Sequence, residues 1–173
     1  GDSWGSHRQL FKDMIYDEAS RVPLVIRLPW LAGNRTEERV VSALDVTATI
    51  VEATGVEAGR PLMGRSLLGL MEELETPWEG VAYIESHGSP GPRSKGRPAF
   101  RGLRTGGDAW GSYSYAEYPE TGEVELYDRA VDPAQLNNVA GRPEYGEVQA
   151  ALAMRLSEFV ARPGYGPRAG GGS

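Results

Sequence analysis

Residues 1–30 read GDSWGSHRQLFKDMIYDEASRVPLVIRLPW, in which a polar, glycine-punctuated loop precedes a short apolar run. The apolar run, residues 22–28, is typical of a strand that is buried on both faces of a parallel sheet and covered by helices. Such sheets place their chemistry at strand ends and in the loops beside them. Lys12 lies between the loop and the run, which makes it the first candidate for a functional side chain.

The composition is that of an ordinary globular chain, with 173 residues, 40% hydrophobic and 24% charged, enough for one core. The net charge of −6 offers no basic patch, so we expect no nucleic-acid partner. No apolar run approaches the length of a bilayer-spanning helix, so we expect no membrane partner either. The chain contains no cysteine, which excludes disulfides and thiolate metal sites and leaves the compartment open.

Residues 41–54 have apolar side chains at helical spacing, which predicts a helix. Ser42 or Asp45 is expected to cap its amino end by accepting backbone N–H bonds, and Gly55 to end it in a left-handed conformation. A second apolar stripe between residues 145 and 160 predicts a terminal helix, which Pro163 and the following glycine end. Residues 164–173 are expected to be a disordered tail.

Between these helices the pattern changes to short strands. The expected strands are residues 81–85, 100–104, 111–117 and 123–128. Residues 86–98 are rich in glycine, proline and serine and predict a long loop. We therefore expect a small antiparallel meander against which the terminal helix packs.

Several strings resemble segments of the sulfatases, members of the alkaline phosphatase superfamily. FKDMIYDEASRVPLVIR (residues 11–27) resembles the segment that contains the sulfate-binding lysine. PLMGRSLL (residues 61–68) is similar to a P-x-x-G-x-S-L turn of the family. ELYD with DPAQLNNVA (residues 125–140) is similar to the carboxy-terminal motif E-L-Y-D-L-x-x-D-P-x-E-x-x-N-L-A, with Gln135 where the family favours glutamate.

The resemblance implies an α/β fold: the end of an alkaline-phosphatase-like central sheet, plus a small antiparallel-sheet subdomain with a carboxy-terminal helix. The implied boundaries are 1–80 for the part of the catalytic domain and 81–163 for the subdomain. The motif of residues 127–140 is expected to be structural, to seat the terminal helix and to lie away from the chemistry. By itself, the run 22–28 would leave unpaired strand edges.

Lys12 matches the family's sulfate-binding lysine. An ammonium beside the non-bridging oxygens stabilises the charge that gathers there in the transition state. His7 is a second catalytic candidate and His87 a substrate-binding one, because imidazole titrates near neutrality. The competing interpretation of each histidine is a solvated loop side chain.

Two parts of the family's chemistry are missing from the sequence. GDSWGSH (residues 1–7) resembles the continuation of a pair of calcium ligands, which would lie upstream of Gly1, so no metal ligand is expected within this chain. Asp2, Asp13 and the pair Asp17 and Glu18 offer carboxylates, but the latter two are more consistent with a capped helical turn. The family's nucleophile, a formylglycine, arises from C/S-x-P-x-R. The nearest string, SPGPR (residues 89–93), has glycine where that motif needs proline.

The expected function is therefore that of part of a sulfuric ester hydrolase, acting on a small-molecule sulfate ester with calcium, and the isolated chain is expected to be inactive. A phosphonate or phosphodiester hydrolase of the same superfamily is the enzymatic alternative. A noncatalytic binding remnant is the alternative from another class. Substrate identity and oligomeric state stay open at this point.

Overall fold

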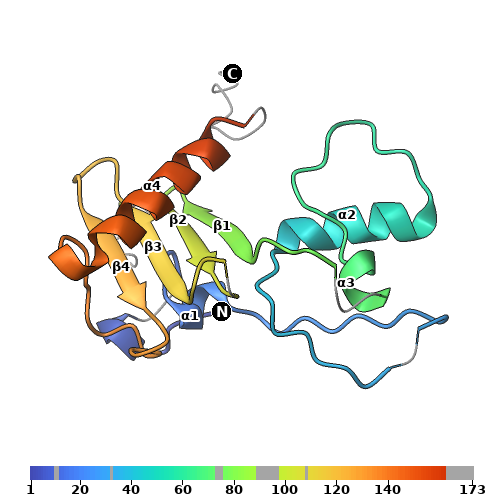
Figure 1. Ribbon diagram of the computed structural model, residues 1–173, viewed down its shortest axis with the longest axis horizontal. Helices are drawn as coiled ribbons and strands as arrows, with labels where there is room; N and C mark the ends of the chain where they lie inside the picture. The colour runs from blue at the N-terminus through green and yellow to red at the C-terminus, as the bar shows by residue number, and fades with distance from the viewer. Residues whose placement is uncertain (10–11, 32, 73–75, 89–97, 108, 163–173) are drawn as a thin grey trace. The chain divides into compact units, whose positions relative to one another are not determined.

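The computed structural model describes residues 1–9, 12–31, 33–72, 76–88, 98–107 and 109–162 (Figure 1). It forms two compact units: Gly1–Arg21 with Tyr83–Arg104 and Ser112–Ser173, and Val22–Ala82 with Thr105–Gly111. The first twenty-one residues thus belong with the sheet rather than with residues 22–80. The expected tail, residues 164–173, lies outside the described residues.

The first unit contains a four-stranded sheet in the order β1-β2-β3-β4. Its elements are β1 (Val81–Ser86), β2 (Phe100–Thr105), β3 (Tyr113–Glu117), β4 (Val124–Asp128), η1 (Ser6–Arg8), α1 (Asp17–Ser20), η2 (Pro143–Tyr145) and α4 (Gly146–Val160). β2 and β3 pair antiparallel, as do β3 and β4. The four predicted strands, the meander and the terminal helix are confirmed.

One face of the sheet lies against α4, which crosses it in Figure 1. Leu103, Tyr115 and Leu126 are in register on this face and are buried. Two contacts join it to α4: the rings of Tyr83 and Phe159 stack with centroids 5.8 Å apart, and the Tyr145 hydroxyl donates to an Asp128 carboxylate oxygen at 3.3 Å. Apolar residues at strand period two therefore meet the apolar stripe of the helix.

The opposite face, here called the inner face, is covered by the segment that follows Lys12. Phe100, Ala116 and Tyr127 alternate with the residues that face α4 and form one buried cluster with Ile15. Gly102 permits this approach, because a Cβ there would lie 2.8 Å from Cδ1 of Ile15. The sheet is thus buried on both sides.

The motif of residues 127–140 has a different role from the one expected. The Asn138 side chain accepts from Leu126 N at 2.9 Å and donates to Val124 O at 3.0 Å, so it pairs with the exposed edge of β4. That asparagine therefore binds backbone groups of β4. The expectation that Tyr127 and the asparagines all seat the terminal helix is wrong, because Tyr127 packs on the inner face and Asn138 binds β4. The side chain of Gln135 contacts Asp17.

The second unit contains α2 (Ala43–Thr54) and α3 (Leu68–Glu72). Both predicted caps of α2 are present: Ser42 Oγ accepts from Leu44 N, and Asp45 Oδ2 accepts from Ser42 N. Gly55 ends the helix at φ 66°. These features depend on sequence neighbours only, which explains why they were predictable.

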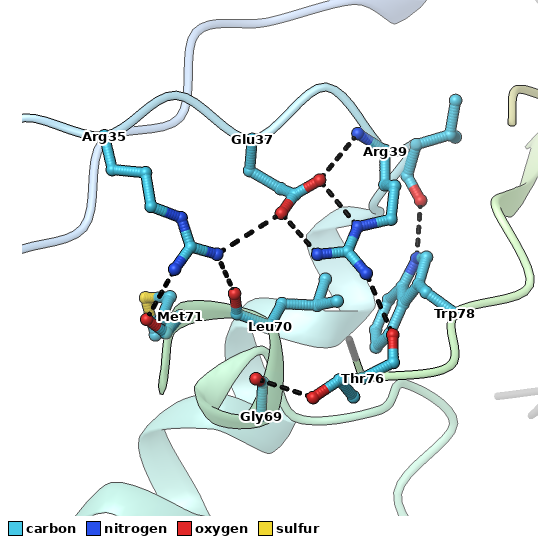
Figure 2. A network of polar contacts seen from close by, with 9 residues as sticks. Arg35, Glu37, Arg39, Gly69, Leu70, Met71, Thr76 and Trp78 are labelled. Carbon is cyan, nitrogen blue, oxygen red and sulfur yellow. Dashed lines mark hydrogen bonds and ion pairs between the residues drawn. The ribbon is translucent and has the colours of Figure 1, made fainter. Parts of the chain in front are cut away.

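Two arginines and a glutamate connect α3 with the segment that precedes α2 (Figure 2). Arg35 donates to the carbonyls of Leu70 and Met71, which lie in the last turn of α3. Glu37 accepts from Arg39 at 2.7 and 2.6 Å and pairs with Arg35 at 3.5 Å. The guanidinium of Arg35 thereby satisfies carbonyls that a helix end leaves without intrahelical partners.

The predicted buried strand at residues 22–28 is wrong for this chain. No strand is assigned there, and Val22, Leu24 and Val25 are exposed, Val25 to 92%. A strand needs a neighbour for its backbone groups and a layer on each face. The four described strands pair with one another, and residues 22–28 lie outside their sheet.

Candidate functional site

Lys12 is exposed at the start of a segment that is otherwise held against the inner face. Asp13 follows it with φ 75°, a left-handed conformation that is uncommon outside glycine. Met14 and Ile15 are then buried, Ile15 to 1% exposure. The backbone beside Lys12 is therefore fixed while its side chain reaches solvent.

Ser86, the last residue of β1, links this segment to the second histidine. Its hydroxyl lies 3.4 Å from Asp13 Oδ1, to which it donates, and accepts from Gly88 N at 3.2 Å. Lys12 precedes Asp13 and His87 follows Ser86, so each is one residue from this contact. His87 is exposed. The structure therefore brings these two candidates to the same end of β1.

His7 is placed differently from the solvated alternative. Its side chain is only 10% exposed, and its ring stacks on Tyr16 with centroids 3.7 Å apart and planes 4° from parallel. Nε2 lies 3.7 Å from a carboxylate oxygen of Glu18. These contacts join His7 to α1 and to Tyr16, the residue before that helix, rather than to Asp13 or Ser86.

Tyr16 also belongs to a hydroxyl-rich cluster on the inner face that sequence reasoning missed. Its OH lies 3.3 Å from the Tyr127 OH and 3.5 Å from a Glu125 oxygen, whose partner oxygen accepts from Tyr118 at 3.1 Å. Burial raises the pKa of Glu125 and that of Tyr16. The period-two spacing of Glu125 and Tyr127 in the ELYD string was the available signal.

Asp17, the first residue of α1, makes two long-range contacts. Its backbone N–H donates to Gln135 Oε1 at 2.8 Å, and its carboxylate forms an ion pair with Arg104 of β2. Gln135 is 1% exposed. Burial lowers the pKa of Arg104 to about 10, and the nearby charge of Arg129 adds to that effect.

Three of the four carboxylates considered as metal ligands contact other partners. Asp13 contacts Ser86, Asp17 contacts Arg104 and Glu18 contacts His7. Within the described residues, no three histidine or acidic side chains come together as a metal site would require. The described carboxylates therefore do not fit a calcium cage, and no chemical step is assigned to calcium in this chain.

Arg93, Lys95 and Arg97 are basic side chains of the glycine- and proline-rich loop that could meet an anionic substrate, although a solvated basic loop is the competing interpretation. They fall outside the described residues, as does the string at residues 89–93. None of the helices that the structure describes has the length and apolar character needed to span a bilayer.

Comparison with known proteins places these features in a family. Residues 5–162 match the family model described as N-sulphoglucosamine sulphohydrolase, C-terminal. The N-acetylglucosamine-6-O-sulfatase of Bacteroides thetaiotaomicron is 31% identical over 158 residues, which cover 89% of this chain and 27% of that protein. The chain thus spans less than a third of that relative's length.

Two solved structures have the same fold. One is a protein in complex with its substrate D-glucosamine-2-N,6-O-disulfate. It matches with a TM-score of 0.71 at 27% identity, and the match covers 90% of this chain and 31% of that chain. The other is the phosphonate monoester hydrolase of Agrobacterium radiobacter. It matches with a TM-score of 0.58 at 26% identity, and the match covers 73% of this chain and 26% of that chain. The predicted family and α/β fold class are confirmed. By the match over residues 5–162, the chain belongs to the sulfatase family, in the region described as the N-sulphoglucosamine sulphohydrolase carboxy terminus.

Proposed function

We propose that this chain is the carboxy-terminal part of a sulfuric ester hydrolase in which Lys12 binds the sulfate group. The observation that supports this most is the position of Lys12, exposed at the end of a fixed segment and one residue from the Asp13–Ser86 contact, in a chain of the sulfatase family. A fixed ammonium beside the non-bridging oxygens stabilises the transition state more than the ground state.

The two histidines take different parts in this proposal. His87, exposed beside Ser86, is proposed to contact the substrate. His7 is proposed to protonate the leaving alkoxide, and its stacking on Tyr16 with Glu18 at 3.7 Å would fix the orientation of its imidazole. Both roles use an imidazole, the side chain that most often transfers protons in general acid–base catalysis.

The remaining chemistry is proposed to come from sequence outside these 173 residues. A formylglycine would supply the nucleophile and calcium would supply charge neutralisation. The described carboxylates offer no cage for that ion. Residues 1–80 would then complete a catalytic domain, with residues 1–21 packed on the small-sheet subdomain formed by residues 81–163. The isolated chain is expected to show no hydrolysis.

The first substrate class to test is a sulfated amino sugar. The relative from Bacteroides thetaiotaomicron is an N-acetylglucosamine-6-O-sulfatase, and one solved neighbour binds D-glucosamine-2-N,6-O-disulfate. The likeness to a phosphonate monoester hydrolase supports the second candidate, a phosphonate or phosphodiester hydrolase of the same superfamily.

The test is turnover of the full-length protein on glucosamine 6-O-sulfate and on a phosphonate monoester. Lys12→Ala should lower sulfate release by about 10²–10³-fold, comparable to the loss of one transition-state donor. Lys12→Arg should not restore the rate fully, since a planar fork replaces a compact charge. Wild-type sulfate release by the alanine variant would overturn the assignment of Lys12. Turnover of the phosphonate alone would favour the second candidate, and binding without turnover would favour a noncatalytic protein.

A further inference from the structure

The amino end of α1 is completed by a side chain from the other end of the chain. The first N–H groups of a helix have no intrahelical partner, and a side-chain acceptor usually satisfies one of them. Tyr16, the N-cap residue of α1, makes no such side-chain bond. Gln135 supplies it instead, accepting from Asp17 N at 2.8 Å.

The backbone at Gln135 adopts a costly conformation in making this contact. Its φ is 54°, in the left-handed region, and its side chain is buried. Two bonds to Asp132 fix the turn: Gln135 N donates to the carbonyl at 3.0 Å, and Asn137 N to Oδ2 at 2.8 Å. A strained backbone of this kind persists where its surroundings determine it strongly, and such positions cluster near functional sites.

The contact lies at one end of the segment that begins with Lys12. Asp17 is held by Gln135 and Arg104 at the far end, and Asp13 is held by Ser86 at the near end. Ile15 is buried between them. With both ends fixed on the inner face, the position of the Lys12 backbone depends on contacts that Lys12 itself does not make.

We propose that Gln135 is a positioning residue for Lys12: its amide oxygen caps α1 and so fixes the lysine segment on the sheet. This inference rests on the proposed function of Lys12. Under this inference the motif of residues 127–140 affects the chemistry through Gln135, a role that the sequence of the motif did not indicate. A displacement of about 1 Å at a reacting group costs on the order of 10²-fold in rate.

The activity test uses the full-length protein and three variants. Gln135→Met keeps the side-chain length and removes the acceptor, Gln135→Glu keeps an acceptor oxygen, and Asn138→Ala is the control. Asn138 belongs to the same motif but binds Val124 and Leu126 of β4. We expect turnover per folded molecule to fall by about 10- to 100-fold in Gln135→Met. Turnover per folded molecule should be restored in the separate variant Gln135→Glu, and it should stay at the wild-type level in Asn138→Ala.

A double-mutant cycle separates positioning from general destabilisation. If Gln135 acts through Lys12, Gln135→Met should cause no further loss in a Lys12→Ala background. A full additional loss in that background, or equal turnover in Gln135→Met and Asn138→Ala, would overturn the inference and leave the role of Lys12 intact. Wild-type turnover in Lys12→Ala would instead overturn the proposed function.

Amide hydrogen exchange supplies a readout that does not depend on activity. In Gln135→Met, the amides of Asp17–Ser20 should exchange faster than in the wild type, because the cap is lost. In Asn138→Ala the faster exchange should appear at Leu126 instead. Unchanged exchange across α1 in Gln135→Met would show that the cap does not hold the segment.

Discussion

The carboxylate of Asp17 forms an ion pair with the guanidinium of Arg104 on the inner face of the sheet, close to a second half-buried guanidinium, that of Arg129. Burial lowers the pKa of both arginines; the charge of Arg129 acts on Arg104, and that of Arg21 acts on Arg129. The guanidinium of Arg104 thus has both the Asp17 carboxylate and the Arg129 guanidinium near it. The two partners of the pair are therefore not equivalent for stability.

Asp17→Asn should destabilise the fold more than Arg104→Met. Removing Asp17 leaves two neighbouring guanidiniums without the carboxylate, whereas removing Arg104 also relieves repulsion with Arg129. Breaking a fully buried pair costs about 3–5 kcal/mol. The side chains here are 24% and 15% exposed, so we expect about 2–3 kcal/mol for Asp17→Asn and about 1 kcal/mol for Arg104→Met. Urea unfolding of the full-length protein measures both, and the reverse order would contradict this account.

Gly64 is required by a close approach to α2. A Cβ at this position would lie 2.2 Å from Leu44 O and 2.5 Å from Asp45 N, both of which are backbone atoms that cannot rotate away. The following backbone N–H of Arg65 donates to Asp45 Oδ1 at 2.8 Å, so the turn is docked on the helix.

Gly64→Ala should therefore lower the free energy of unfolding by about 1–3 kcal/mol, as overpacking does elsewhere. Gly59→Ala is the matched control, because a Cβ there meets nothing within 4 Å. Gly59→Ala should leave the free energy of unfolding unchanged or raise it by about 0.4–1 kcal/mol, because alanine lowers the conformational entropy of the unfolded chain. Thermal unfolding of the two variants side by side tests the difference, and equal melting temperatures would refute the close-approach argument.

Glu37 makes the contact between α3 and the segment that precedes α2 dependent on pH. Hydrogen bonds from Arg39 lower the pKa of Glu37 to about 2, from an ordinary value of 4.5. Because this pKa is lower in the folded state, the carboxylate stabilises the fold above about pH 4.5, and that contribution disappears as the pH falls toward 2. The side chain is 29% exposed, so solvent screening limits the contribution to about 1 kcal/mol or less.

Glu37→Gln should therefore lower stability at pH 7 and lose its difference from the wild type as the pH falls from 4.5 toward 2. Glu57→Gln, at an exposed position after α2, controls for the general effect of removing one negative charge. Denaturant midpoints across this pH range measure the effect. If the difference in denaturant midpoint between Glu37→Gln and the wild type stays constant down to pH 2, protonation of Glu37 is not coupled to stability.

Features fixed by neighbours in sequence were predictable, and those fixed by distant pairing were not. The caps at Ser42 and Gly55 need only adjacent residues, and the period-two alternation around Tyr115 and Leu126 predicts strands because side chains on a strand alternate between faces. The site residues divide in the same way. Lys12 became a candidate because of its local string, whereas Asp17 is contacted by Arg104 and Gln135, for which no local pattern exists.

The run at residues 22–28 shows the limit of apolar pattern alone. A continuous apolar stretch is compatible with a buried strand, but pairing depends on a neighbour that the stretch itself does not specify. In this chain Leu24, Val25 and Ile26 line a groove of about 380 Å³, to which Leu31, Leu67 and Leu70 also contribute. An apolar surface of this kind promotes association in water.

The isolated 173-residue chain should therefore self-associate through the apolar run. Val25, exposed to 92%, lies at its centre, and a lysine there would place a charge on the surface that must be buried for association. Val25→Lys should shift the chain toward monomer at micromolar to millimolar concentration, the range in which exposed hydrophobic surface causes aggregation. Val131→Lys is the control, since Val131 is 75% exposed in the turn after β4 and belongs to the other compact unit. Sedimentation velocity over a concentration series measures the shift. A wild-type chain that stays monomeric throughout, or equal effects of the two lysines, would contradict association through residues 22–28.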